Sequence, residues 1–160
     1  MSALGGFIMS ALIFVYGTLK QGFPNFHLNP GQRVPGQFRT IDALPLYVVQ
    51  LPHEDRAPWL MQAPGQGHQV IGQVFQVDDA TLRSMDRFEE VGQPTGYVRC
   101  EVRLEAIDAS GEVLRAQAYL KPVEQMRDCL AVEGPFAEYT LELCEGYRLV
   151  WPGQPPTEPG

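Results

Sequence analysis

Short strand-like segments separated by glycine and proline dominate the sequence, and a single segment has the pattern of a helix. Residues 12–16, Leu-Ile-Phe-Val-Tyr, are apolar on both faces and indicate a central, buried strand. Residues 69–77 alternate between apolar and polar side chains and indicate a half-buried strand. Residues 97–107 and 113–120 indicate two further strands, and the Asp-Ala-Ser-Gly-Glu sequence between them predicts a hairpin turn. The chain therefore builds mainly a sheet.

Glycine and proline interrupt the rest of the chain and predict loops around these strands. Residues 17–32 predict a loop with at most a short helix, and residues 37–51 predict two strand-like pieces divided at Pro45. Residues 56–69 hold a short apolar piece followed by a flexible turn, and the chain after Lys121 predicts irregular structure. Because strands dominate, we expect an α+β fold: a small, mixed, barrel-like sheet with one main helix and short peripheral helices.

The length of 160 residues and the apolar fraction of 44% are those of a single globular domain with its own core. The sequence Met-Ser-Ala-Leu occurs at residue 1 and again at residue 9, which suggests that translation naturally starts at Met9. We expect residues 1–8 to be a disordered extension, residues 9–152 to form the domain, and residues 153–160 to be a disordered tail. The apolar start follows no lysine or arginine and is too short to span a bilayer.

Charge and cysteine content narrow the classes of function. The formal net charge of −7 argues against binding to nucleic acid or anionic membranes, which select basic patches. The cysteines are odd in number and form no Cys-x-x-Cys pair, which favours a reducing compartment and argues against disulfides and a zinc site; they are Cys100, Cys129 and Cys144. The histidines lack metal-ligand spacing. We expect a cytoplasmic monomer or weak homodimer with no metal and no cofactor.

The one helical segment begins with Asp78 and Asp79, which provide N-cap chemistry, and runs to about Glu90. At about 100° per residue, its apolar side chains gather on one face of the helix. With Leu82 placed at zero, that face is centred near about 300° and also contains Met85 and Phe88. The pattern predicts an amphipathic helix packed against the sheet.

Two adjacent glutamates near the end of this helix have different predicted environments. Glu89 falls at about 340°, inside the apolar face, whereas Glu90 falls at about 80°, on the solvated side. A carboxylate directed toward a core or a cavity is costly unless it is hydrogen-bonded, and its pKa tends to rise. Glu89 is therefore a candidate general acid or base. The alternative is that Glu89 pairs with Arg99 or Arg103.

The stretch that follows the first strand, Tyr-Gly-Thr-Leu-Lys, has two interpretations. The strand stops at Gly17, so the stretch is an ordinary loop or a backbone cradle for a negatively charged group. A glycine turn at the end of a strand presents successive N–H groups as a concave anion site. We favour the backbone amides before Lys20, rather than the Lys20 side chain, as the ligands of such a group.

Three pieces of the sequence form a recognisable set: Val-Tyr-Gly-Thr-Leu-Lys-Gln-Gly-Phe-Pro-Asn near the start, Leu-Arg-Ser-Met-Asp-Arg-Phe-Glu-Glu-Val in the helix, and Gly-Tyr-Val-Arg after it. Together they resemble the γ-glutamylcyclotransferase-like family. The segment between the first two pieces, from Pro-Leu-Tyr-Val-Val to Gln-Val-Phe-Gln-Val, is most similar to its γ-glutamylamine cyclotransferase branch. The resemblance covers roughly residues 12–121. It implies that Glu89 is the catalytic residue, and that the substrate-binding residues are Tyr16, Gly17, Thr18, Leu19 and Tyr97.

The resemblance implies a reaction in which the α-amine of a γ-glutamyl group attacks its own γ-carbonyl. The products are 5-oxoproline and a released amine, and the partner is a small-molecule γ-glutamyl substrate. The segment after Lys121 matches no motif, and we expect it to shape the leaving-group side of the pocket. Three alternatives stay open: a non-catalytic module that binds a glutamyl or carboxylate ligand, a biosynthetic enzyme that removes a γ-glutamyl protecting group, and an activity toward glutathione or γ-glutamyl amino acids.

Overall fold

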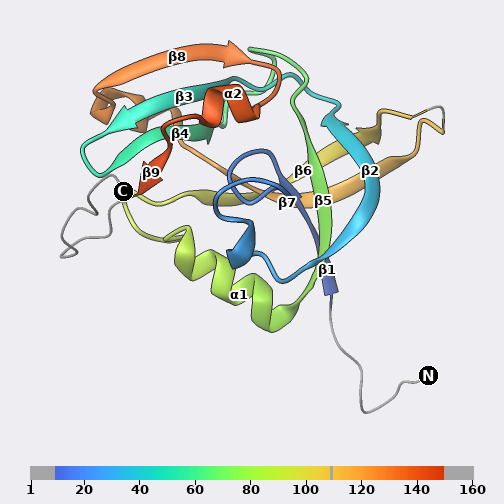
Figure 1. Ribbon diagram of the computed structural model, residues 1–160. Coiled ribbons are helices and arrows are strands. Elements are labelled where there is room, and N and C mark those ends of the chain that lie inside the picture. Colours follow the sequence, from blue (N-terminus) through green and yellow to red (C-terminus); the bar gives the residue numbers. More distant parts are fainter. Residues whose placement is uncertain (1–9, 109, 150–160) are drawn as a thin grey trace.

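Five strands close into a barrel in the computed structural model, which describes residues 10–108 and 110–149 (Figure 1). The order around the barrel is β1 (Ser10–Val15), β5 (Ile71–Asp78), β2 (Gln32–Thr40), β6 (Val98–Ala106) and β7 (Val113–Leu120). Neighbouring strands pair antiparallel, except that β1 meets β7 in parallel where Ile13 lies opposite Gln117. The barrel is therefore mixed, as the sequence predicts.

A second sheet of four strands packs at one end of the barrel (Figure 1). Its order is β8 (Ala131–Phe136), β3 (Leu46–Leu51), β4 (Glu54–Leu60) and β9 (Arg148–Leu149). Backbone hydrogen bonds join the two sheets where β4 and β7 end. The Lys121 amide donates to the Leu60 carbonyl at 2.8 Å, and the Gln62 amide donates to the Lys121 carbonyl at 2.8 Å. This junction holds the ends of β4 and β7 side by side.

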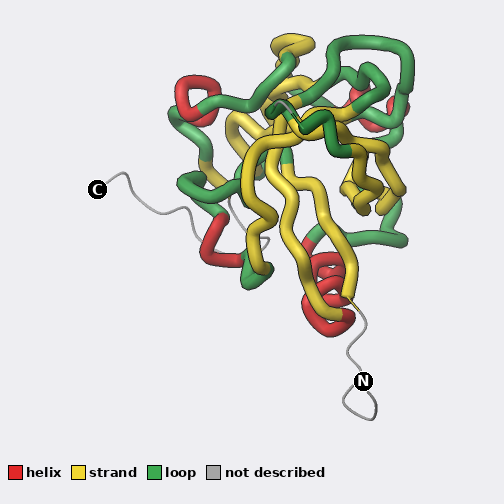
Figure 2. The backbone as a smooth tube through the Cα atoms, turned by 90° about the vertical axis from the view of Figure 1, so that its right-hand side faces the viewer, coloured by secondary structure: helices red, strands yellow, loops and turns green. Residues whose placement is uncertain are grey.

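The main helix, α1 (Asp79–Phe88), begins where β5 ends. The Asp78 carboxylate accepts a hydrogen bond from the Thr81 amide at 2.8 Å and so caps the helix. Buried Met85 and half-buried Leu82 pack on apolar side chains of β1 and β5. Figures 1 and 2 both place α1 below the barrel strands. Three shorter helices complete the described chain: η1 (Phe26–Leu28), η2 (Val123–Asp128) and α2 (Leu141–Cys144).

Apolar side chains fill the barrel and continue beneath the second sheet. The largest cluster includes Phe14, Phe38, Leu46, Leu60, Val74, Leu104 and Tyr139, each almost fully buried. A separate cluster on the second sheet is built on Val49, Ala57, Trp59 and Met61. The two sheets therefore pack as one body, with Leu46 and Leu60 contributed by the second sheet to the barrel core.

The predicted α+β class, the barrel-like sheet and the single main helix are confirmed. The irregular structure predicted after Lys121 is wrong, because that segment forms η2, β8, α2 and β9. β8 contains Gly134 and Pro135 and is largely exposed, so it lacks the apolar alternation of a strand. It lies at the edge of its sheet, where glycine and proline are tolerated. The predicted extension at 1–8 and tail at 153–160 lie outside the described residues.

No helix among residues 10–108 and 110–149 is both long enough and apolar enough to cross a membrane.

Tyr139 links the turn after β1 to the second sheet, which gives a test of this packing. Its hydroxyl donates to the Arg56 carbonyl at 2.7 Å, and its carbonyl accepts from Lys20 Nζ at 2.6 Å. Tyr139→Phe leaves the Arg56 carbonyl without this donor, so we expect the free energy of unfolding to fall by about 1–3 kcal/mol in urea denaturation.

Tyr47→Phe is the matched control. The Tyr47 hydroxyl makes no hydrogen bond to any residue in the described ranges, so this change should stay within about 0.5 kcal/mol. Equal effects of the two substitutions would contradict the linking role of Tyr139.

Candidate active site

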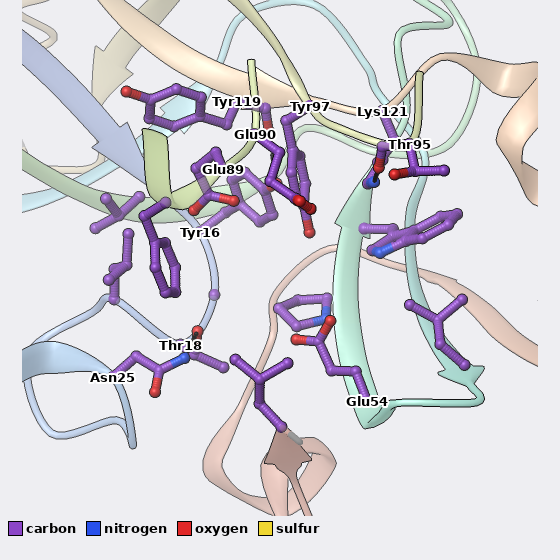
Figure 3. A pocket seen from close by; sticks show the side chains of 18 of the residues that line it. Tyr16, Thr18, Asn25, Glu54, Glu89, Glu90, Thr95, Tyr97, Tyr119 and Lys121 are labelled. Carbon is purple, nitrogen blue, oxygen red and sulfur yellow. Dashed lines mark hydrogen bonds between the residues drawn. The ribbon is translucent and has the colours of Figure 1, made fainter. Parts of the chain in front are cut away.

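A pocket of about 690 Å³ opens where the barrel, the end of α1 and the second sheet meet (Figure 3). This volume is typical of small-molecule sites and exceeds what a glutamyl group alone needs. All six residues singled out by the sequence line it: Tyr16, Gly17, Thr18, Leu19, Glu89 and Tyr97. The structure thus brings them together, although they come from three separate segments. Their roles stay predictions.

The turn after β1 forms one wall of the pocket. The strand ends at Val15, and the Lys20 amide donates to the Gly17 carbonyl at 3.1 Å, which closes a turn over residues 17–20. The amides of the two central residues, Thr18 and Leu19, have no acceptor among the described residues. The turn therefore offers two free N–H donors beside the pocket.

Gly17 is required by packing rather than by an unusual backbone angle. A Cβ atom at this position would lie 2.5 Å from Cγ of Pro58, which belongs to β4. Such a contact is too short for carbon atoms, so a side chain would push the turn away from the second sheet. The glycine thus sets the distance between the two walls of the pocket.

A chain of hydrogen bonds ties this turn to the second sheet. The Asn25 side-chain amide donates to Thr18 Oγ1 at 3.0 Å and to the Tyr147 hydroxyl at 3.0 Å. The Tyr147 hydroxyl in turn donates to Glu54 Oε2 at 2.9 Å. The backbone N–H of Asn25 also donates to the Thr18 carbonyl at 2.9 Å. Three distant parts of the chain therefore hold the Thr18 side chain in one position.

The side chains of Tyr16 and Lys20, which lie before and after the free amides in the sequence, make hydrogen bonds to other parts of the chain. The Tyr16 ring lines the pocket, but its hydroxyl donates to the Tyr119 carbonyl at 2.6 Å. Lys20 is only 3% exposed, and its ammonium group lies 4.2 Å from the centre of the Phe23 ring and donates to the Tyr139 carbonyl. Burial lowers the pKa of Lys20 to about 8. Lys20 does not line the pocket, whereas Gly17, Thr18 and Leu19 do.

Glu89 lies at the point where α1 ends, opposite the turn. Its backbone is still close to helical, with φ −85° and ψ 3°, and its amide donates to the Met85 carbonyl at 2.9 Å. Its carbonyl accepts the Tyr97 amide at 2.9 Å, which holds Tyr97 beside it. Glu90 follows with a left-handed φ of 56° and is exposed. The contrast between the two glutamates comes partly from helical phase and partly from this reversal of the backbone.

The Glu89 carboxylate is half-buried and has no hydrogen-bond or ion-pair partner among residues 10–108 and 110–149. The sequence left open a pair with Arg99 or Arg103. Arg99 pairs instead with Asp86 at 2.9 Å, and Arg103 pairs with Asp42 at 3.0 Å. The pairing alternative for Glu89 is therefore wrong.

The surroundings of Glu89 favour its protonated form. Burial raises the pKa of Glu89 to about 8, and the nearby carboxylates of Glu54 and Glu90 add to this rise, while Lys121 opposes it. At neutral pH the group therefore lies close to the midpoint of its titration. A carboxyl group in this condition can both accept and donate a proton.

Lys121 supplies a buried positive charge on the far side of Tyr97. Its ammonium group donates to the Thr95 carbonyl at 2.7 Å and to Gln125 Oε1 at 2.9 Å. It also lies 4.3 Å from the centre of the Tyr97 ring and 4.5 Å from that of Trp59, within cation–π range. Burial lowers the pKa of Lys121 and raises that of Tyr97 well above its ordinary value.

Among the pocket residues that the sequence prediction missed, four make the hydrogen bonds described above: Asn25, Glu54, Lys121 and Tyr147. Asn25 belongs to the first motif, so its capacity to cap the turn was a usable signal. Glu54 and Lys121 stand at the start of β4 and just after β7, and only the pairing of the two sheets brings them to one pocket. Tyr147 comes from the segment predicted as irregular. That segment does line the pocket, as expected.

The described residues include no group of three or more His, Cys, Asp or Glu side chains arranged to hold a metal ion. The chemically capable groups in the pocket are instead a carboxyl group near its titration midpoint, two free turn amides and a buried ammonium group. These can exchange a proton with a bound amine and stabilise a developing oxyanion.

Comparisons with known proteins identify relatives of this chain. The family model described as γ-glutamyl cyclotransferase, AIG2-like, matches residues 13–138. The γ-glutamylaminecyclotransferase of Mus musculus is 36% identical over 107 residues, which are 64% of this chain and 68% of the relative. The protein of that name from Homo sapiens is 39% identical over 103 residues, which are 61% of this chain and 64% of the relative.

The fold has a solved counterpart. The crystal structure of an AIG2-like protein from Mus musculus superposes with a TM-score of 0.68 and 30% identity, and covers 94% of this chain and 99% of that chain. The match to the family model spans most of the chain and includes both the turn after β1 and Glu89. The chain therefore belongs to the γ-glutamyl cyclotransferase, AIG2-like family, and is an enzyme of the γ-glutamylcyclotransferase type.

Proposed function

We propose that this enzyme is a γ-glutamylamine cyclotransferase, which converts a γ-glutamylamine to 5-oxoproline and a free amine. The observation that carries the proposal is the unpaired, half-buried carboxyl group of Glu89, which shares a pocket with the free amides of Thr18 and Leu19. The names of the relatives from mouse and human support this choice of substrate class. The cytoplasmic location and the monomeric or weakly homodimeric state stay predictions from the sequence.

The reaction needs no nucleophile from the protein, because the substrate carries its own. The α-amine of the glutamyl group forms a bond to the γ-carbonyl carbon, and the bond from that carbon to the departing nitrogen breaks. A well-oriented intramolecular attack of this kind lowers the barrier by about 7–11 kcal/mol. The role of the pocket is to fold the glutamyl chain so that the two groups meet.

Glu89 performs the proton transfers in this mechanism. As the carboxylate, it takes a proton from the substrate ammonium group and so frees the lone pair for attack. As the acid, it then gives that proton to the departing nitrogen, so the group returns to its starting form. The attacking nitrogen loses a second proton as the ring amide forms, and this proton passes to solvent or to the released amine. Its pKa of about 8 supports both steps, since a carboxyl group of ordinary pKa would be a weak base toward an ammonium group.

The free amides of Thr18 and Leu19 supply hydrogen bonds to the substrate in this mechanism. One correctly aimed donor to a developing oxyanion contributes about 3 kcal/mol. The hydrogen bonds from Asn25 keep the turn in place before substrate arrives, which preorganises these donors. Tyr97 lines the pocket beside Glu89 and forms a wall for the glutamyl chain.

An activity assay of variants at two adjacent glutamates, Glu89 and Glu90, tests the proposal. The wild-type enzyme should release 5-oxoproline from γ-glutamylamines such as γ-glutamyl-ε-lysine, and Glu89→Gln should lower kcat by about 100-fold or more while KM changes little. Glu90→Gln removes the neighbouring, exposed carboxylate and should stay within a few-fold of wild type. Full activity of Glu89→Gln, or a large loss in Glu90→Gln, would contradict the assignment.

The pH dependence of kcat/KM gives a second test. Below its pKa Glu89 is protonated and cannot accept the substrate proton, so log kcat/KM should rise with pH up to about 8 and then level off. The Glu90 carboxylate raises the pKa of Glu89, so Glu90→Gln should move this rise to lower pH. A rise centred near 4.5, the ordinary value for glutamate, would be incompatible with the proposed environment.

A further inference from the structure

Glu54 is a second pocket carboxylate for which the proposed mechanism has no use. It stands at the start of β4, half-buried, and lines the pocket across from Glu89 (Figure 3). One oxygen accepts the Tyr147 hydroxyl, and no ion pair neutralises the group within the described ranges. Burial raises the pKa of Glu54, which reflects the cost of holding this charge away from water.

The cations near Glu54 do not balance its charge. Lys121 and His53 face it and favour its charged form. The Lys121 ammonium group is held by Thr95, Gln125 and two aromatic rings, out of ion-pair distance from Glu54. His53 is exposed. Two carboxyl groups therefore face one pocket without an ion-pair partner in the described ranges, and the charge of Glu54 raises the pKa of Glu89.

A γ-glutamyl group can provide a positive charge to only one of the two carboxylates, Glu54 or Glu89. It carries a single ammonium group, which is the nucleophile of the reaction and must meet Glu89. Glu54 lies on the second sheet, the wall opposite α1, and faces Leu149 where β4 pairs with β9. The apolar residues Leu51, Pro52 and Pro58 line the same pocket, together with the polar residues His53 and Tyr147. An alkyl chain that ends in a positive charge would find both apolar contacts and an acceptor for its charge here.

On the basis of the proposed function, we infer that Glu54 recognises a second ammonium group, carried by the amine that leaves. Among the γ-glutamylamines of the proposed function, Glu54 would favour those whose leaving amine ends in a second positive charge. The Tyr147 and Asn25 hydrogen bonds hold the carboxylate in position before substrate binds. Glu54 would then determine which amine is accepted, while the glutamyl half of the site stays common to all substrates.

Two matched conjugates test this role. In γ-glutamyl-1,4-diaminobutane the amine ends in an ammonium group, and in γ-glutamyl-pentylamine a methyl group replaces it. Wild type should favour the cationic conjugate in kcat/KM by about 10- to 100-fold, the usual effect of a hydrogen bond to a charged group. Glu54→Gln should lose this preference, so the ratio of kcat/KM for the cationic conjugate to that for γ-glutamyl-pentylamine should fall to about one. The ratio is the readout, because loss of the Glu54 charge also lowers the pKa of Glu89 and so changes the turnover of both conjugates.

Glu124→Gln provides the control for loss of one negative charge, because Glu124 is exposed on η2 and does not line the pocket. It should keep the preference. Equal turnover of both conjugates by wild type, or an equal loss with both in Glu54→Gln, would overturn the role of Glu54. The comparison in wild type does not depend on the folding of any variant. A wild-type enzyme that releases 5-oxoproline from neither conjugate would instead contradict the proposed function.

Discussion

The unpaired carboxyl group of Glu89 is the feature on which the rest of the site depends. The fold keeps potential partners away from it. Asp86, one turn earlier in α1, accepts hydrogen bonds from both Arg99 at 2.9 Å and the Tyr119 hydroxyl at 2.7 Å. Arg99 is thereby paired with Asp86 and not with Glu89. Leaving a half-buried carboxylate without a partner destabilises the folded chain, and such unfavourable environments are typical of catalytic groups.

The two sheets contribute different halves of the pocket. The barrel provides the turn after β1, and α1, which follows β5, carries Glu89; together they form the wall suited to a glutamyl group. The second sheet provides Glu54 and the apolar neighbours that suit the departing amine. The contact between Gly17 and Pro58 sets the spacing of the two walls.

Local sequence patterns predicted the two parts of the pocket that a single helix or a single turn forms. Glu89 was found from helical phase, because α1 is a short amphipathic helix with a clear apolar face. The turn was found from the stop of an apolar strand at Gly17. Glu54 and Tyr147 could not be found in this way, because their approach to the turn depends on the pairing of β4 with β9. β9 has only two residues, too few for a pattern.

The reason for Gly17 also needed the structure. The sequence indicated only that a turn begins at Gly17, whereas the structure shows that a Cβ atom there would collide with the Pro58 side chain. The direction of the Lys20 side chain also depends on tertiary packing. A lysine beside a glycine turn has the sequence signature of an anion ligand, yet tertiary packing over Phe23 and the Tyr139 carbonyl turns it away from the pocket. Side-chain direction in a turn is decided by such contacts rather than by the local sequence.

The central claim, that the pocket holds Glu89 close to its titration midpoint at neutral pH, can be measured without substrate. Carbon-13 NMR of side-chain carboxyl groups, recorded against pH for wild type and for Glu89→Gln, would assign the Glu89 resonance by its absence from the variant. The account predicts a midpoint for this resonance near pH 8. A midpoint near 4.5, the value for an ordinary glutamate, would contradict it.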